Sequence, residues 1–105
     1  MIGPIYIVTV FEQTDSSGRH PDHRVWGWMP THLEAAKAVL TNATDMFEGR
    51  FYRWAVIEEV KHGIIARSVA VEWFEASLTE DREDITVAPC APPEWSKGSC
   101  NWSMG

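Results

Sequence analysis

Cysteine is scarce in this 105-residue sequence, which contains only Cys90 and Cys100, both near its C-terminal end. The two residues lack the tight C-x-x-C spacing of a structural zinc site, and one pair does not make a disulfide-rich scaffold. The longest apolar stretch, MIGPIYIVTVF, is too short to cross a bilayer and carries no basic region of a signal peptide. We therefore expect a cytoplasmic protein without a membrane partner, in which both cysteines remain thiols.

Basic side chains are outnumbered, nine against fifteen acidic ones, which gives a formal net charge of −6 at pH 7. An acidic surface repels a phosphate backbone, so we do not expect duplex nucleic acid as a partner. Six of the nine basic residues are arginines, whose planar guanidinium group suits a small phosphate or carboxylate. A compact anionic ligand is therefore compatible with the composition.

Sequence signatures of catalysis are also missing, since there is no nucleophile motif, phosphate-binding loop or glycine-rich dinucleotide fingerprint. His20 and His23 flank Asp22 at a spacing that zinc ligands in a loop can have. No second pair of ligand residues follows at a useful distance, so we interpret this segment as a polar loop. We expect no metal and no cofactor.

Four glutamates on two neighbouring predicted strands are the remaining candidates for acid–base chemistry: Glu58, Glu59, Glu72 and Glu75. Paired carboxylates can act as a general acid and a general base. On solvated strand faces, however, such residues more often pair with cations of the neighbouring strand, which here are Arg53, Lys61 and Arg67. We therefore favour cross-strand ion pairs and do not expect an enzyme.

The composition of the chain is typical of a small globular domain, with 45% hydrophobic and 23% charged residues. A chain of 105 residues fills one hydrophobic core, so we expect a single domain over residues 1–105, with its core over 4–88 and an irregular tail over 89–105. Six tryptophans are many for this length. Each offers a large apolar surface and a flat face for stacking, which indicates either a core or a binding platform.

Hydrophobic patterning predicts an α+β fold with a mostly antiparallel sheet of four to five strands and one amphipathic helix on one face, in the order β-β-α-β-β. The expected strands cover residues 5–12, 24–29, 51–60 and 64–76, with a short edge strand over 85–88. A T-x-x-E capping box at Thr31 and Glu34 predicts the helix start, and the helix is expected to end near Asp45 to Phe47. Its expected inward face consists of Leu33, Ala36, Leu40, Ala43 and Phe47.

The predicted strands 5–12 and 51–60 carry apolar residues on both faces, which is typical of strands covered on both sides. A single helix covers only one side of the sheet. The second side needs the tail with Trp95 and Trp102, another subunit or a partner to cover it. We expect a homo-oligomer whose contact covers this side.

A candidate ligand site lies on the predicted strand 24–29, where alternation places Arg24, Trp26 and Trp28 on one face. Guanidinium groups and aromatic planes together suit a nucleotide, through charge-assisted hydrogen bonds and stacking. The alternative is that both tryptophans pack beneath the helix, as buried aromatic pairs in strands commonly do, with the arginine at the rim of the strand. The complete set of expected ligand-binding residues is Arg24, Trp26, Trp28, Arg53, Trp54 and Arg67.

Several distinctive segments follow one another along the chain: YIVTVF, the WGW strand, THLEAAKAVLTNATDMFE, FYRWAVIEEVKHGI and VEWFEA, then the ending P-E-W-x-K-G-x-x-N-W-x-x-G. In this order they resemble a family of small proteins from tailed phages and prophages. The similarity covers most of the chain and carries no catalytic residue across. It implies a protein that works in the cytoplasm of a bacterial host, where small phage proteins without enzymatic motifs often act against immunity.

The resemblance thus implies a non-enzymatic counter-defence binding protein, and we expect it to sequester a small nucleotide-derived immune signal. The first alternative is a protein-binding inhibitor of a host defence complex, similar in action to anti-CRISPR proteins, whose acidic surface is a decoy for a basic nucleic-acid-binding groove. A third hypothesis, a hydrolase that destroys the signal, requires carboxylates such as Glu58 and Glu72 to converge in a cleft.

Overall fold

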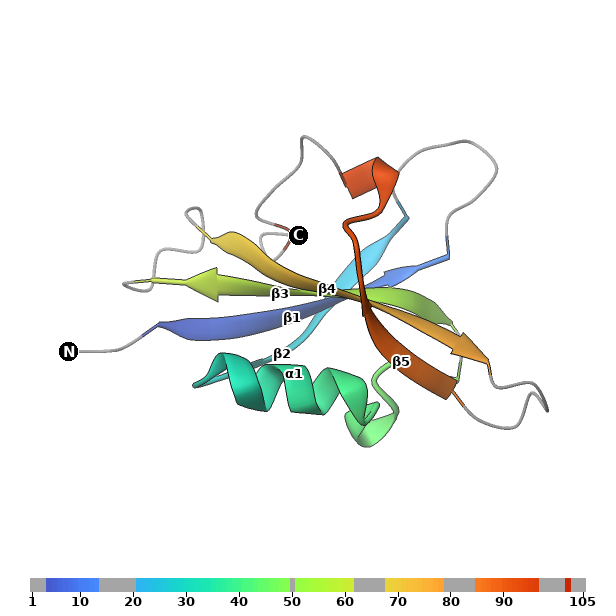
Figure 1. Ribbon diagram of the computed structural model, residues 1–105, viewed down its shortest axis with the longest axis horizontal. Coiled ribbons are helices and arrows are strands. Elements are labelled where there is room, and N and C mark those ends of the chain that lie inside the picture. Colours follow the sequence, from blue (N-terminus) through green and yellow to red (C-terminus); the bar gives the residue numbers. More distant parts are fainter. Residues whose placement is uncertain are drawn as a thin grey trace.

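The computed structural model describes residues 4–13, 21–49, 51–61, 68–78, 85–96 and 102 of the chain. Five strands form one antiparallel sheet, and the described ranges contain one α-helix, so the expected α+β fold is confirmed (Figure 1). The strands are β1 (Ile5–Glu12), β2 (His23–Met29), β3 (Tyr52–Val60), β4 (Val69–Leu78) and β5 (Ile85–Cys90). They lie in the order β2-β1-β3-β4-β5, which makes β2 and β5 the edge strands. Positions 64–67 of the expected fourth strand lie outside the described residues.

The helix α1 (His32–Leu40) begins at the predicted capping box. The Thr31 hydroxyl accepts the backbone N–H of Glu34 at 3.1 Å and donates to the Glu34 carboxylate at 3.1 Å. The first of these bonds satisfies a backbone N–H that the first turn of a helix leaves without a partner. No helix in the part of the chain that the structure describes has the length and apolarity that crossing a bilayer requires.

The end of α1 and its inward face differ from the prediction. Asn42 has left-handed backbone angles (φ 50°) shortly after the helix, and a 3-10 turn, η1 (Ala43–Asp45), replaces the expected last turns. Asparagine tolerates this conformation better than most residues and therefore ends the helix early. Leu33 and Leu40 were expected to face inward but are 77% and 44% exposed. The buried residues of α1 are Ala35, Ala38 and Val39.

The helix packs on one face of the sheet, below it in Figure 1, where it contacts β1, β2, β3 and β5. Small side chains on α1 allow a close approach, and two large side chains from the segment after the helix fill the remaining space. We call this buried cluster the helix-side core. It consists of Val8, Val10, Ala35, Ala38, Val39, Met46, Phe47, Tyr52, Ala55, Ile57, Phe74 and Ala76.

A second buried cluster, the tail-side core, covers the opposite face of the sheet. The chain leaves β5 and crosses over this face, where a short 3-10 helix, η3 (Glu94–Ser96), lies on the side opposite α1 (Figure 1). The Trp95 ring lies 5.0 Å from the ring of Phe11 and 5.3 Å from that of Trp54. The cluster contains Phe11, Trp54, Val56, Trp73 and Trp102, with Cys90 and Trp95 packed against it.

The tail-side core decides between the three ways in which the second face was expected to be covered. Trp95 and Trp102 of the chain itself lie against Phe11 and Trp73, so neither a subunit nor a partner is needed over this part of the sheet. The homo-oligomer remains a prediction. The argument that an uncovered sheet face requires it does not hold where the tail covers the sheet.

Candidate functional site

Arg24, Trp26 and Trp28 were expected to share one face of β2, but a β-bulge places Trp28 on the face opposite the other two. Adjacent residues of β1 pair with Gly27 and Val25, so Trp26 is the extra residue between them. One extra residue in a strand shifts the alternation of the side chains beyond it to the other face. The expected common face is therefore wrong. An isolated glycine within a strand pattern is a known signal of a bulge, so the W-G-W sequence contained the information.

Arg24 and Trp26 lie on the helix side of the sheet. Trp26 packs against the helix-side core, as the alternative interpretation had it for both tryptophans. The guanidinium carbon of Arg24 lies 5.4 Å from the centre of the Tyr52 ring, and Arg24 forms an ion pair with Glu48. This arginine is thus already paired with an acidic side chain.

Trp28 lies on the other side of the sheet, opposite Ile7 of β1, and is 61% exposed. Val25 is on the same side, because it pairs with Thr9, and it is exposed as well. Both residues belong to an edge strand. Together they form an apolar surface that we call the β2 patch.

Arg53 and Trp54 lie together near the start of β3. The guanidinium carbon of Arg53 is 4.6 Å from the centre of the Trp54 ring. Its Nε and Nη2 atoms lie 2.8 and 2.6 Å from Oε2 of Glu75 on β4, which confirms the expected cross-strand ion pair for this arginine. Cation–π stacking on Trp54 and two hydrogen bonds to the Glu75 carboxylate both hold the Arg53 guanidinium at this position.

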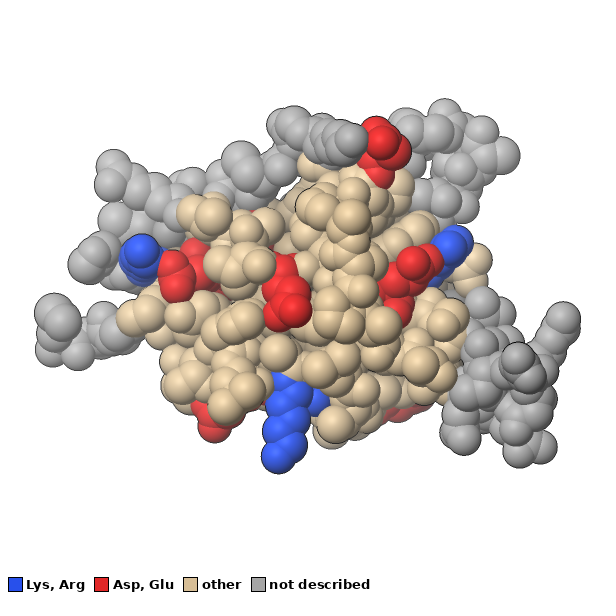
Figure 2. All heavy atoms as spheres, viewed as in Figure 1, with Lys and Arg blue, Asp and Glu red and all other residues tan. Residues whose placement is uncertain are grey.

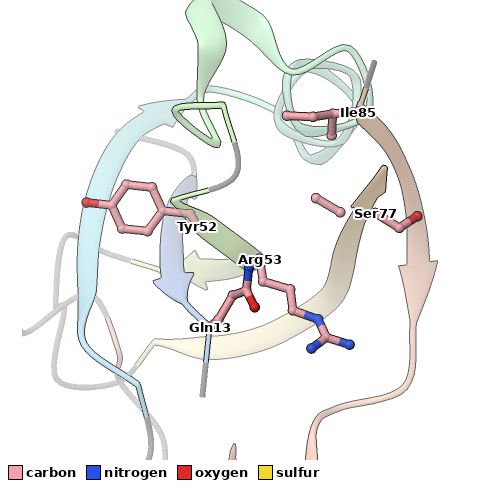
Figure 3. A pocket seen from close by; sticks show the side chains of 6 residues that line it. Gln13, Tyr52, Arg53, Ser77 and Ile85 are labelled. Carbon is pink, nitrogen blue, oxygen red and sulfur yellow. The ribbon is translucent and has the colours of Figure 1, made fainter. Parts of the chain in front are cut away.

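A recess beside Arg53 is too tight to admit a water molecule. Figure 3 shows the guanidinium pointing toward β4 and β5, with Gln13 beside it, while the Tyr52 ring points the other way, toward β2. A nucleotide therefore does not fit here without rearrangement of the surrounding side chains. The lining residues are Gln13, Tyr52, Arg53, Ala76, Ser77 and Ile85.

The expected ligand-binding residues do not converge on one surface. Trp54 pairs with Phe11, whereas Trp28 pairs with Ile7, four positions and about 13 Å away along β1. Arg24 and Trp26 face the helix on the opposite side of the sheet. Arg67 lies outside the described residues.

The carboxylates Glu58 and Glu72 lie on opposite faces of the sheet and do not meet in a cleft. Glu72 pairs with Ile57, the neighbour of Glu58 on β3, so its side chain points to the helix side, where it lies 2.9 Å from Nε2 of His32. Glu58 is fully buried on the tail side. The geometry that a two-carboxylate hydrolase requires is therefore not formed by this pair.

A polar group that the sequence pattern did not reveal lies beside the start of α1. The Tyr6 hydroxyl donates a 2.8 Å hydrogen bond to Glu59, which raises the pKa of Tyr6 and lowers the pKa of Glu59. Lys61 lies 3.4 Å from Glu59, two positions away on the same segment, so the ion pair of Lys61 is not the cross-strand pair that we expected. The His32 ring lies 5.9 Å from the Tyr6 ring. These residues come from three distant segments, so no local spacing could indicate the group.

Within the described ranges, no group of three or more His, Cys, Asp or Glu side chains is arranged to hold a metal ion. His23 lies on β2, while His20 lies outside the described residues.

An open hollow of about 320 Å³ lies where β5 leaves the sheet. Figure 2 views the molecule from this edge and shows acidic side chains spread over a largely uncharged surface. Within the part of the chain that the structure describes, the hollow and the β2 patch both offer apolar contact area at the sheet edges. The hollow is lined by Ala70, Val71, Glu72, Trp73, Pro89, Cys90 and Pro92.

No protein-family model, curated protein or solved structure matches this chain.

Proposed function

We propose that this protein acts by stoichiometric binding to another protein, as a phage counter-defence protein that inhibits a bacterial defence complex. The observation that carries the proposal is Trp28, a tryptophan that is 61% exposed on an edge strand and has Val25 beside it. Tryptophan is among the residue types that most often dominate binding energy at protein interfaces. An exposed tryptophan beside another exposed apolar side chain does not stabilise an isolated molecule in water.

The rest of the fold supports a role for the sheet edges in recognition. The proposal takes α1 to cover one face of the sheet in the β-β-α-β-β arrangement and the C-terminal tail to cover the other. Of the tryptophans, Trp54, Trp73 and Trp102 are buried, so Trp28 is an exception within the same chain. The net charge of −6 favours a partner with a basic surface, such as a groove that binds nucleic acid.

Sequestration of a nucleotide is the second candidate, and one observation favours it: the stacked pair of Arg53 and Trp54. Two facts weigh against it. The guanidinium is engaged by Glu75, and the recess beside it has no room for a water molecule. A nucleotide would have to break a charge-assisted hydrogen bond and open the recess before it could bind.

The proposal is tested by plaque formation on bacteria that carry single, defined defence systems. Cells expressing the wild-type protein are challenged with a phage that each system restricts, beside cells expressing Trp28→Ala or Leu33→Ala. Leu33 is 77% exposed on α1 and therefore serves as a matched surface control. We expect the wild type and Leu33→Ala to restore plaques on the same system, and Trp28→Ala to lose about tenfold or more, the effect of losing a hot-spot side chain.

Equal plaque counts for Trp28→Ala and the wild type would contradict the proposal. Release of an intact nucleotide from the heat-denatured wild-type protein, purified from the same infected cells, would favour sequestration instead.

A further inference from the structure

The strand β4 extends beyond its partner β5. Pairing between the two strands runs from Leu78 opposite Ile85 to Trp73 opposite Cys90 and ends there. Of the first four residues of β4, Val69, Ala70 and Glu72 pair with β3 on one side, and Val71 is the extra residue at a register shift. Among the described residues, this stretch has no strand beside it on the other side. Backbone N–H and C=O groups on such an edge are available to another extended chain.

The hollow of about 320 Å³ lies directly beside this free stretch of edge. Its walls are the free part of β4 and the segment from Pro89 to Pro92, where the chain turns away from the sheet toward η3 (Figure 1). Val69 and Val71 are 60% and 44% exposed. The position that β5 would occupy if it continued is thus open to solvent and partly apolar.

We propose that this edge binds an extended, basic segment of a partner polypeptide, which adds to β4 as an antiparallel strand in the position that β5 leaves open. The mode is β-strand addition, in which main-chain hydrogen bonds provide affinity and alternate side chains provide specificity. The inference is independent of Trp28, which lies on the opposite edge strand, and it goes beyond the proposed function by naming a second surface and the chemistry of its ligand.

The two faces of the edge differ and define the side chains of the ligand. On the tail side, Trp73, Cys90 and Pro92 offer an apolar surface. On the helix side, Glu72 lies in the hollow. Its described neighbour is His32, which carries charge only when protonated. An added strand places alternate side chains on these two faces, so a segment with apolar residues on one face and basic residues on the other is complementary.

A second copy of this chain is a less suitable occupant. Each copy carries a net charge of −6, and pairing of two identical edges would bring the Glu72 carboxylates of both copies to the same short interface. Like charges across a strand pair are destabilising. Four residues on each side also bury far less than the roughly 1,200 Å² of a stable interface.

The test uses the peptide acetyl-KVKVKV-amide and two isomers of it, one N-methylated at the valines and one at the lysines. In a strand, successive N–H groups point to opposite edges, so only one isomer has its methyl groups directed at β4. We expect the parent and one isomer to bind, and the other isomer to bind about tenfold more weakly because it loses several hydrogen bonds. Nuclear magnetic resonance should show shifts and slowed amide exchange within Val69–Glu72.

Charge is tested with Glu72→Lys and with Asp22→Lys, an equal change in net charge at an exposed residue next to the opposite edge strand. We expect Glu72→Lys to weaken binding of the parent peptide about fivefold or more and Asp22→Lys to have little effect. Trp28→Ala should leave peptide binding unchanged, so failure of this inference and failure of the proposed function are distinguishable.

Three results would overturn the inference. The first is equal binding of both N-methylated isomers, and the second is no response of the Val69–Glu72 amides at saturating peptide. The third is a free protein that is dimeric and in which these amides are already protected from exchange. That result would make a second copy of the chain the occupant of the edge.

Discussion

Trp102 donates its backbone N–H to the carboxylate of Glu58 at 2.9 Å, although the two residues are 44 positions apart in the sequence. The Ser68 hydroxyl donates to the same oxygen at 3.2 Å. Glu58 is fully buried, so a carboxylate in the sheet holds the C-terminal tail over the second face. Hydrogen bonds to a charged acceptor are about twice as strong as those between neutral groups.

Replacing Glu58 tests this connection. We expect Glu58→Ala to lower the free energy of unfolding by about 3 kcal/mol, because it leaves buried donors without their acceptor. Glu58→Gln keeps an amide oxygen that can accept from Trp102 and should be milder. Urea unfolding followed by tryptophan emission measures both. An alanine variant as stable as the wild type would show that the carboxylate does not hold the tail.

The hydrogen bond between Tyr6 and Glu59 predicts a pH dependence of stability. It lowers the pKa of Glu59, with a further lowering by Lys61, below the ordinary value of 4.5. A group with a lowered folded-state pKa contributes stability above its ordinary pKa and loses it as the pH falls below that value. We expect the melting temperature of the wild type to fall more between pH 6 and pH 3 than that of Tyr6→Phe. Parallel curves for the two proteins would contradict this.

The alkaline side follows from the same bond. The pKa of Tyr6 is raised above 10.0, first by the bond to Glu59 and then by burial. A group with a raised folded-state pKa contributes stability below its ordinary pKa and loses it as the pH rises through the folded value. The wild type should therefore lose stability relative to Tyr6→Phe above pH 10. If the melting temperatures of the two proteins do not approach each other there, the hydrogen bond does not raise the pKa of Tyr6 as described.

The hydroxyl of Thr9 is buried in the centre of β1 and has no hydrogen-bond partner among the described residues. A buried hydroxyl without a partner is destabilising, and valine has nearly the same shape without the polar atom. We expect Thr9→Val to raise the free energy of unfolding by about 1 kcal/mol, the cost of burying such a group. Thr9→Ala is the control, because it removes the hydroxyl but also a methyl group and should destabilise. Destabilisation by valine would show that the hydroxyl is stabilising and would contradict this prediction.

Cys90, at the edge of the hollow, should be a poor nucleophile. Burial raises the pKa of its thiol above the ordinary 9.0, and Glu75 raises it further, so little thiolate is present at pH 8. In a Cys100→Ser background, iodoacetamide should modify Cys90 more slowly in the folded protein than in urea, and Glu75→Gln should accelerate the folded reaction. If the folded protein reacts as fast as the unfolded one, the thiol is not protected as described.

Local signals in the sequence were sufficient to predict which segments form helices and strands. They were not sufficient to predict which side chains lie on which face of each strand. The capping box at Thr31 fixed the helix start, because its hydrogen bonds lie within one turn. The helix end depended on the backbone angles of Asn42, which a hydrophobic pattern does not encode. Register shifts occur between β1 and β2, between β1 and β3 and between β3 and β4, and each reverses the alternation that a strict period of two assumes.

The candidate site was less predictable for the same reason. The expected pairing of Arg53 with a glutamate of the neighbouring strand is confirmed, because the two strands form an antiparallel pair. The particular partner, Glu75, lies opposite Trp54 and not opposite Arg53. Strict alternation places Trp28 on the same face as Arg24, which is wrong because Trp26 is an extra residue between them. The hollow depends on where β5 ends and the tail departs, which long-range packing of Trp95 and Trp102 decides.

Native mass spectrometry of the protein, purified from bacteria whose defence system it neutralises, tests the central claim most directly. The account predicts a species whose mass is the sum of this chain and an intact defence protein in a fixed ratio, present with the wild type and with Leu33→Ala and lost with Trp28→Ala. A chain that carries only the added mass of a nucleotide, unchanged by Trp28→Ala, would contradict it.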